Sequence, residues 1–338
     1  MNANPALVEV LRGGTVESRH RVSVVVSDSA GRHPLALGDV AAPVFPRSAI
    51  KVMQALPLVE SGAARALGFT PAELALVTAS HNGEEAHVEG ARALLDRVGR
   101  DETCLVCGAQ WPGREDDRGR LHRAGLRPSR LHNNCSGKHA GFVCFAVHAG
   151  LDPAGYGDLD HPVQREIAAA IADVTGVDLD RAPVGHDGCS IPTWALPLDA
   201  VACGFARLAT GEGLAPQRAA AGRLLIEAAI AHPFMIAGTN RFCTDFIGAC
   251  GGEVYVKTGA EGVFAAALPG LGLGLAVKCD DGAARAAEVV TATVVARLLG
   301  RTDDPALARF LRPEIRDWNG ATVGELRPAS GWIEALAR

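Results

Sequence analysis

Apolar and β-branched residues form short runs near both ends of the chain, which predicts strands in those regions. Residues 20–27 (HRVSVVVS) precede a polar turn at 28–31 and a second short run at 34–37, a pattern typical of a hairpin. Three further strand-like runs, separated by Gly and Pro, lie at residues 253–258, 262–268 and 271–278.

Between these runs the apolar residues recur at helical spacing. Ile50, Met53 and Leu56 follow one another at a spacing of three, and Pro57 is expected to kink or end the helix that they predict. Residues 100–130 are rich in Arg, Asp and Gly and predict a surface excursion. Further helices are predicted at residues 71–78, 84–98, 138–148, 163–174, 216–231 and 283–299.

Strands at both ends with helices between them predict an α/β (α+β) fold. One antiparallel sheet, from roughly residues 5–45 and 250–300, is expected to be flanked by helices, with a helical region at roughly 46–245 inserted between its two parts. No segment is typical of a linker, so residues 1–338 are expected to form a single compact catalytic domain. The longest uncharged apolar stretch, 263–277, contains Pro269 and is too short for a bilayer, so no membrane association is expected.

Composition narrows the class of protein. The 338 residues are 48% hydrophobic and 21% charged, which is typical of a globular chain and excludes disorder as its main state. The net charge is −5 and no Lys/Arg run occurs, so nucleic acid is not an expected partner. The first residues do not resemble an export signal, and the nine cysteines are an odd number, which favours reduced thiols in the cytoplasm.

Lysine is rare in this chain. Only four of the 33 basic residues are lysine, at Lys51, Lys138, Lys257 and Lys278. Arginine stays protonated at any working pH, whereas lysine can lose its proton and act as a base or a ligand. The remaining lysines are therefore candidates for chemistry, although chance retention is the alternative for any one of them.

Ser48 and Lys51 form a Ser-x-x-Lys motif at the start of a predicted helix. A spacing of three places both side chains on one helical face, where a neutral amine could take the proton of the hydroxyl and make it a nucleophile. The motif is weak evidence alone, because a helix-capping serine with an incidental lysine has the same sequence.

Two further short motifs follow in order. Ser80, His81 and Asn82 lie between two predicted helices, and the triplet at residues 257–259, which begins with Lys257, ends a predicted strand. Ser-x-x-Lys, Ser-x-Asn and Lys-Thr-Gly in this order resemble the motifs of penicillin-recognising enzymes and class A β-lactamases.

Two separate segments carry cysteine beside glycine and other potential metal ligands. Residues 133–139 (NNCSGKH) contain Cys135 and Lys138, and residues 186–189 (HDGC) contain Cys189. Two thiols from different loops suit zinc, with Lys138, His139 or Asp187 as the third ligand. The alternative is a pair of buried free thiols.

These motifs together resemble the Rhizobium-type (class 3) L-asparaginases of the asparaginase II family. The resemblance is carried by residues 47–51 (RSAIK), 79–81 (ASH), 134–139 (NCSGKH), 187–189 (DGC) and 241–244 (RFCT), and it extends over most of the chain. It implies a serine β-lactamase/transpeptidase-like and glutaminase-like fold, a homodimer, and an L-asparagine amidohydrolase that produces L-aspartate and ammonia.

The resemblance also implies roles for individual residues. It implies two Ser–Lys tandems, Ser48 with Lys51 and Ser80 with Lys257. It further implies a zinc ion that organises the substrate site. The implied zinc ligands are Cys135, Lys138 and Cys189.

The expected mechanism begins with attack of Ser48 on the amide carbonyl of asparagine, with Lys51 as the base. Arg47 and Asp187 are candidates, by charge, for binding the carboxylate and the ammonium group of the substrate. His81, Asn82 and Cys243 are further candidates for lining its pocket, and a plain turn is the alternative for the segment that contains Cys243. Alternatives are a serine glutaminase or a penicillin-interacting hydrolase of the same fold, and a zinc-binding structural protein that has no amidase activity.

Overall fold

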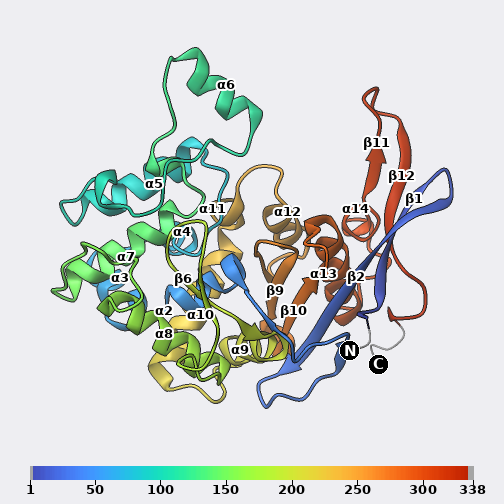
Figure 1. Ribbon diagram of the computed structural model, residues 1–338, viewed down its shortest axis with the longest axis horizontal. Coiled ribbons are helices and arrows are strands. Elements are labelled where there is room, and N and C mark those ends of the chain that lie inside the picture. The colour runs from blue at the N-terminus through green and yellow to red at the C-terminus, as the bar shows by residue number, and fades with distance from the viewer. Residues whose placement is uncertain (1–2, 334–338) are drawn as a thin grey trace. The chain divides into compact units, whose positions relative to one another are not determined.

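The computed structural model describes residues 3–333 and has a mixed α/β architecture (Figure 1). The chain divides into two compact units. The sheet unit consists of Met1–Ala49, Leu196–Gly213 and Phe246–Arg338, and the helical unit consists of Ile50–Ala195 and Leu214–Asp245. Each unit has its own core. The single catalytic domain over residues 1–338 stays a prediction, and residues 1–2 and 334–338 lie outside the described part.

The sheet unit is built around an eight-stranded antiparallel sheet in the order β11-β12-β1-β2-β10-β9-β8, with β3 paired to β2. Both ends of the chain therefore contribute strands to one sheet, and the predicted α+β class is confirmed. The strands are β1 (Ala6–Arg12), β2 (Thr15–Asp28), β3 (Leu35–Leu37), β8 (Tyr255–Thr258), β9 (Val263–Leu268), β10 (Leu273–Cys279), β11 (Glu314–Arg316) and β12 (Thr322–Pro328). A small pair, β4 (Pro43–Val44) with β7 (Leu196–Pro197), belongs to the same unit.

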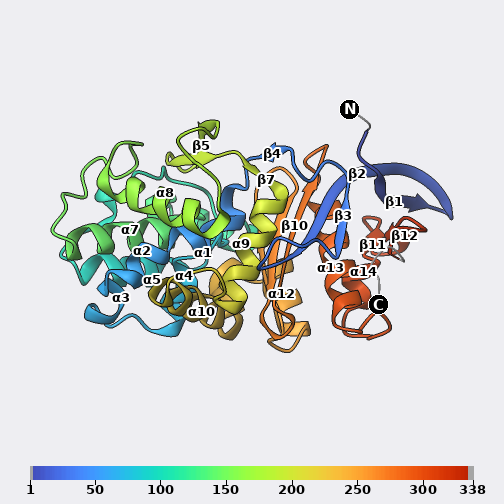
Figure 2. The ribbon, with the colours of Figure 1, turned by 90° about the horizontal axis from the view of Figure 1, so that it is seen from below.

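Helices cover both faces of the central strands. Helix α9 (Leu198–Thr210) packs on β2, β9 and β10, and α13 (Ala284–Leu298) packs on β9 and β10, on the opposite face in Figure 2. All six residues of β9 are buried, as expected for a strand covered on both sides. A Cβ on Gly274 would lie 2.0 Å from the carbonyl oxygen of Ala202, so only glycine lets α9 pack this closely. The unit also contains α14 (Ala308–Leu311) and η4 (Pro269–Leu271).

The helical unit contains all the helices predicted for the middle of the chain. The structure ends α1 at Gln54 and begins α2 at Leu56 with Pro57 in its first turn, which confirms the predicted interruption. Its helices are α1 (Lys51–Gln54), α2 (Leu56–Glu60), α3 (Ala63–Ala66), α4 (Pro71–Leu76), α5 (Glu85–Asp96), η2 (Glu102–Cys104), α6 (Glu115–Arg123), η3 (Arg130–His132), α7 (Ser136–His148), α8 (Pro162–Thr175), α10 (Pro216–Ala231) and α11 (Pro233–Ala237).

A short hairpin of β5 (Val184–His186) and β6 (Pro192–Trp194) completes the helical unit. In two helices the first residues belong to one unit and the last residues to the other. They are η1 (Arg47–Ile50) and α12 (Phe242–Ala249). No helix within residues 3–333 is both long enough and apolar enough to cross a membrane.

Candidate active site

Lys51 begins α1, and its side chain is fully buried in the helical unit. Its Nζ donates hydrogen bonds to Ser80 Oγ (3.0 Å), to Cys135 Sγ (3.0 Å) and to the carbonyl oxygen of Ala79. An amine removed from water needs partners of this kind, because burial without them is costly. One predicted catalytic amine, one predicted catalytic hydroxyl and one predicted metal-binding thiol therefore meet at a single buried point.

The contact between Lys51 and Ser80 differs from the predicted pairing. The sequence analysis expects Ser48 beside Lys51 and Ser80 beside Lys257, and both of those pairs stay predictions. The observed hydrogen bond adds a Ser–Lys contact within the helical unit that the motif spacing did not indicate.

Ser80, His81 and Asn82 lie in an extended segment between α4 and α5, as predicted, and all three are at least 95% buried. Their backbone N–H groups bond to chain segments on both sides. Ser80 N donates to Ile236 O (2.8 Å), His81 N to Asn134 O (3.1 Å) and Asn82 N to Ala237 O (2.9 Å). These bonds hold the backbone of the segment in place, and the Ser80 hydroxyl accepts its hydrogen bond from Lys51.

His81 is held as a neutral imidazole. Its Nδ1 accepts a hydrogen bond from Gly83 N (3.1 Å), so Nε2 carries the proton and donates to Ser136 Oγ (3.0 Å). Burial lowers the pKa of His81 well below its usual value, and repulsion from the stacked His87 (ring centroids 4.7 Å apart) and from Lys51 lowers it further. The ring therefore acts as a fixed hydrogen-bond donor that orients the loop.

The lowered pKa of His81 predicts loss of stability in mild acid. The unfolded imidazole binds a proton below about pH 6.5 whereas the folded one does not, so the unfolded state gains protons and the free energy of unfolding falls as the pH decreases. We expect this residue to contribute a slope of up to about 1.4 kcal/mol per pH unit below 6.5. Urea unfolding from pH 7.5 to 5 would measure it.

His81→Asn should reduce this slope but not abolish it, because burial also lowers the pKa of His87, His132 and His139. His33→Asn, at an exposed histidine, is the matched control. An equal slope in the wild type and in His81→Asn would contradict a neutral, buried His81.

The side chain of Asn82 belongs to a buried polar network. Its amide nitrogen donates to Glu84 Oε1 (3.1 Å) and to Thr239 O (3.0 Å), and its amide oxygen accepts from Arg241 Nη1 (2.9 Å). Glu84 also accepts from Thr239 N (2.7 Å), from the Thr239 hydroxyl (2.7 Å) and from Arg114 (3.0 Å). Burial tends to raise the pKa of Glu84, but these hydrogen bonds lower it overall, so the carboxylate stays charged.

The sequence analysis missed Glu84 and Arg241 as functional candidates. No sequence pattern pointed to them, because their contacts with Asn82 form only in the folded unit. Gly238 makes room for these contacts: it has φ of 103°, and an added Cβ would lie 2.4 Å from Glu84 Oε1 and 2.8 Å from the Asn82 amide nitrogen. This glycine lets the Glu84 carboxylate approach the backbone, and the turn that it begins leads to Arg241. Cys243, a predicted pocket residue, follows in the same stretch and is buried.

The helical unit also brings Cys135, Lys138 and Cys189 together. Cys135 directly precedes α7 and Lys138 lies in its first turn, whereas Cys189 lies in the turn of the β5–β6 hairpin. Lys138 Nζ donates to Cys189 Sγ (3.2 Å), and the two thiols are hydrogen-bonded to each other. All three side chains are at least 96% buried. Two thiols and an amine at one point are a donor set that suits a zinc-type ion.

The electrostatics of this cluster favour a thiolate. The hydrogen bond from Cys189 lowers the pKa of Cys135 well below its usual value, and the positive charges of Lys51 and Lys138 add to this effect although burial opposes it. Burial alone would lower the pKa of Lys138, but attraction to the two cysteines raises it overall. A metal ion would have to displace the Lys138 proton.

The two alternative third ligands are placed differently from Lys138. His139 Nδ1 lies 2.6 Å from the hydroxyl of Tyr156, which holds the ring against that side chain. Asp187 is half-buried in the β5–β6 turn and accepts a hydrogen bond from Gly188 N (2.6 Å). Of the three candidates, Lys138 is the one with a described hydrogen bond to a cysteine of the cluster.

The sheet unit carries the remaining predicted residues. Lys257 is fully buried on β8, and its Nζ donates to the carbonyl oxygen of Thr258 (2.9 Å). A Cβ on Gly259 would lie 2.6 Å from Pro46 O, so glycine lets the end of β8 pack beside the segment that leads to Ser48. Ser48 is half-buried in η1.

Arg47, the predicted carboxylate-binding residue, precedes Ser48 in η1 and has φ of 51°. Such a left-handed backbone is strained for an arginine and is often found at functional sites.

The α+β fold and the buried cluster of amine, hydroxyl and thiol groups can be compared with known protein families. The family model for L-asparaginase II matches residues 8–328 of the 338. The chain therefore belongs to the L-asparaginase II family, as the motifs indicated, and membership of this family supports L-asparaginase activity. No curated protein matches the chain.

Proposed function

We propose that the protein hydrolyses L-asparagine to L-aspartate and ammonia by nucleophilic catalysis at Ser48. The observation that carries this proposal is the Lys51 amine, which is buried without exposed surface and bonded to Ser80. Lysine, unlike arginine, can lose its proton and work as the neutral base that a serine nucleophile needs. Membership of the L-asparaginase II family supplies the substrate.

In the proposed first half-reaction, the Ser48 oxygen attacks the side-chain amide carbonyl and its proton passes to Lys51. The tetrahedral intermediate then breaks its C–N bond, and the leaving nitrogen takes a proton and departs as ammonia. An aspartyl ester of Ser48 remains.

In the second half-reaction, water attacks the ester carbonyl. Ser80 and Lys257 relay the proton of this water, and the Ser48 oxygen leaves with a proton to regenerate the hydroxyl. Aspartate then dissociates.

We propose that other polar residues bind the substrate. Arg47 and Asp187 are proposed for the carboxylate and ammonium groups of the amino acid, by charge. The remaining candidates for the pocket are His81, Asn82 and Cys243. Because the Asn82 amide is already bonded to Glu84 and Arg241, its contribution would be to hold Arg241 in place.

We propose zinc as a cofactor at Cys135, Lys138 and Cys189, where the donor set fits it. When bound, zinc would supply positive charge that keeps both thiols ionised. We further propose that the protein has a serine β-lactamase-like fold, forms a homodimer and is cytoplasmic. The Lys-Thr-Gly triplet at the end of β8 supports the β-lactamase-like fold.

Purified protein is expected to release ammonia from L-asparagine with a kcat/KM about 10–200-fold higher than from L-glutamine, because one extra methylene displaces the amide carbonyl from the nucleophile. Coupled ammonia assays with both substrates measure the ratio. Faster release from glutamine, or covalent labelling by a fluorescent penicillin, would favour the alternative hydrolases. No ammonia from either amide would contradict an amidohydrolase.

A further inference from the structure

A second cluster of metal-ligating side chains lies in the sheet unit, apart from any residue used above. His20 Nδ1 is 2.6 Å from Asp281 Oδ2, and Cys279 Sγ is 2.9 Å from Asp281 Oδ1. One ligand atom from each of the three residues lies within 4.8 Å of the other two. An imidazole, a thiol and a carboxylate thus converge from chain segments that are 259 residues apart.

The sheet register accounts for this convergence. Cys279, the last residue of β10, pairs with Val22 of β2. His20 lies two residues along β2 from Val22 and therefore on the same face, diagonally opposite Cys279, within reach of a long side chain. The register thus brings His20 and Cys279 together without help from a loop.

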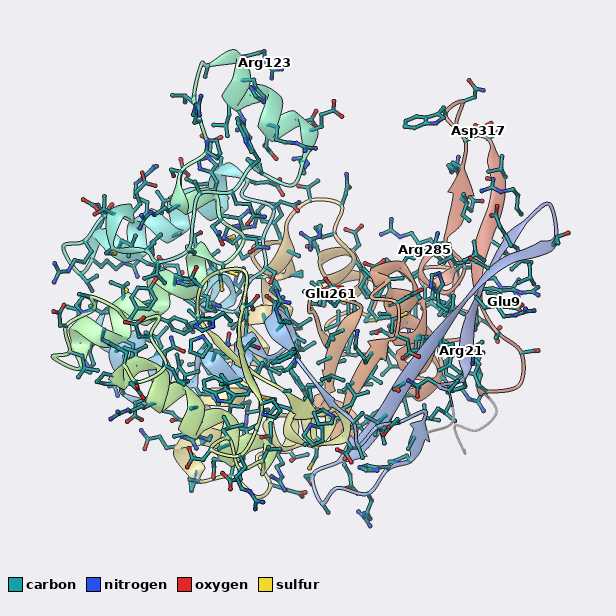
Figure 3. All side chains as sticks on the ribbon, viewed as in Figure 1. Glu9, Arg21, Arg123, Glu261, Arg285 and Asp317 are labelled. Atoms are coloured by element: carbon teal, nitrogen blue, oxygen red, sulfur yellow. The ribbon has the colours of Figure 1, made fainter. Side chains whose placement is uncertain are left out.

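Asp281 reaches the pair from the turn that follows β10. This turn is fixed to β2 because Asp280 N donates to the carbonyl of Arg21 (2.9 Å), a residue labelled in Figure 3. On its other side, Asp281 Oδ1 accepts from Ala283 N (3.0 Å) at the beginning of α13. The carboxylate is therefore positioned by the backbone rather than by its two neighbours alone.

The distances suit a tetrahedral ion after a small outward movement. Zinc binds sulfur at about 2.3 Å and nitrogen or oxygen at about 2.0–2.2 Å, so its ligand atoms lie about 3.3–3.7 Å apart. The observed hydrogen-bond separations of 2.6 and 2.9 Å need to lengthen by less than about 1 Å to reach this range. We propose that His20, Cys279 and Asp281 form a second divalent-cation site of zinc type, with a water as the fourth ligand.

Burial and charge agree with this assignment. Cys279 and His20 are buried, whereas the Asp281 side chain is 49% exposed, which leaves a route by which an ion and its water can enter. A thiolate and a carboxylate with a neutral imidazole balance the charge of a divalent ion, and binding releases the thiol proton of Cys279 to solvent.

Binding a cation would change the protonation of the His20 imidazole. His20 Nε2 is buried and has no hydrogen-bond partner among residues 3–333. Without a metal the proton is on Nδ1, because the Asp281 carboxylate 2.6 Å away can only accept a hydrogen bond. A bound cation would take the place of that proton, and the ring would then carry its proton on Nε2.

The test is a titration of the metal-stripped full-length protein with Co²⁺, whose bond to a thiolate gives a near-ultraviolet charge-transfer band. Cys279→Ser and the isosteric Asp281→Asn are each expected to lose one equivalent of bound Co²⁺ relative to the wild type. Cys203→Ser, at another buried thiol of the sheet unit, should lose none. Circular dichroism confirms that each variant is folded.

Cys189→Ser separates this site from the zinc site in the proposed function. In that variant the band from Cys279 should persist, and in the double variant Cys189→Ser/Cys279→Ser it should disappear. If Cys279→Ser and folded Asp281→Asn bind as much Co²⁺ as the wild type with the same band, the proposed site is overturned. That result would leave the asparaginase proposal untouched, because none of its residues is involved.

Discussion

Lys51→Arg is expected to lower kcat for asparagine hydrolysis by roughly 10³–10⁴-fold, close to the full contribution of a general base. Arginine keeps the positive charge but stays protonated at any working pH, so it cannot accept the serine proton. Its branched head also has to occupy the space of a single Nζ that donates to Ala79, Ser80 and Cys135 with no exposed surface. The loss of the base and the misfit of the larger side chain both lower kcat.

The matched control is Lys278→Arg. Lys278 lies on β10, is partly exposed, and donates only to backbone carbonyl groups in its described hydrogen bonds, so arginine there should leave kcat within about twofold. Steady-state ammonia release gives kcat, and thermal unfolding reports whether each variant is folded. A folded Lys51→Arg enzyme that keeps more than a tenth of wild-type kcat would remove Lys51 from the role of base.

The fold was predictable where apolar runs are long and buried. Strands β8, β9 and β10 and the helix α13 coincide with predicted elements because most of their residues are buried. Strands β11 and β12 were missed because most of their side chains are exposed or half-buried, so they show no clear apolar alternation.

The site was predictable only where its residues are close in sequence. Ser80 and Lys51 were found from short motifs, but their mutual hydrogen bond joins residues 29 positions apart and depends on how the loop after α4 packs against α1. Glu84 and Thr239 are 155 positions apart and meet only in the folded unit. Local patterns identify residue types suited to chemistry, whereas long-range packing decides which of them touch.

The two candidate serines are expected to differ in the step that they block. Ser48→Ala removes the proposed nucleophile and should lower kcat by roughly 10⁴-fold or more, with no burst of ammonia. Ser80→Ala removes a proton relay that bonds to Lys51 Nζ at 3.0 Å, so kcat should fall by roughly 10²–10⁴-fold. Because that relay is assigned to hydrolysis of the ester, acylation should survive better than deacylation in Ser80→Ala.

Rapid-quench measurements distinguish these outcomes. Ser80→Ala should release about one ammonia per enzyme molecule in a burst and accumulate an aspartyl ester, which peptide mass spectrometry would locate on Ser48. Ser61→Ala, at an exposed helix end, should behave as wild type. If the ester instead accumulates on Ser80 in the Ser48→Ala enzyme, then the roles are reversed: the serine that directly contacts Lys51 is the nucleophile, and Ser48 serves the later step.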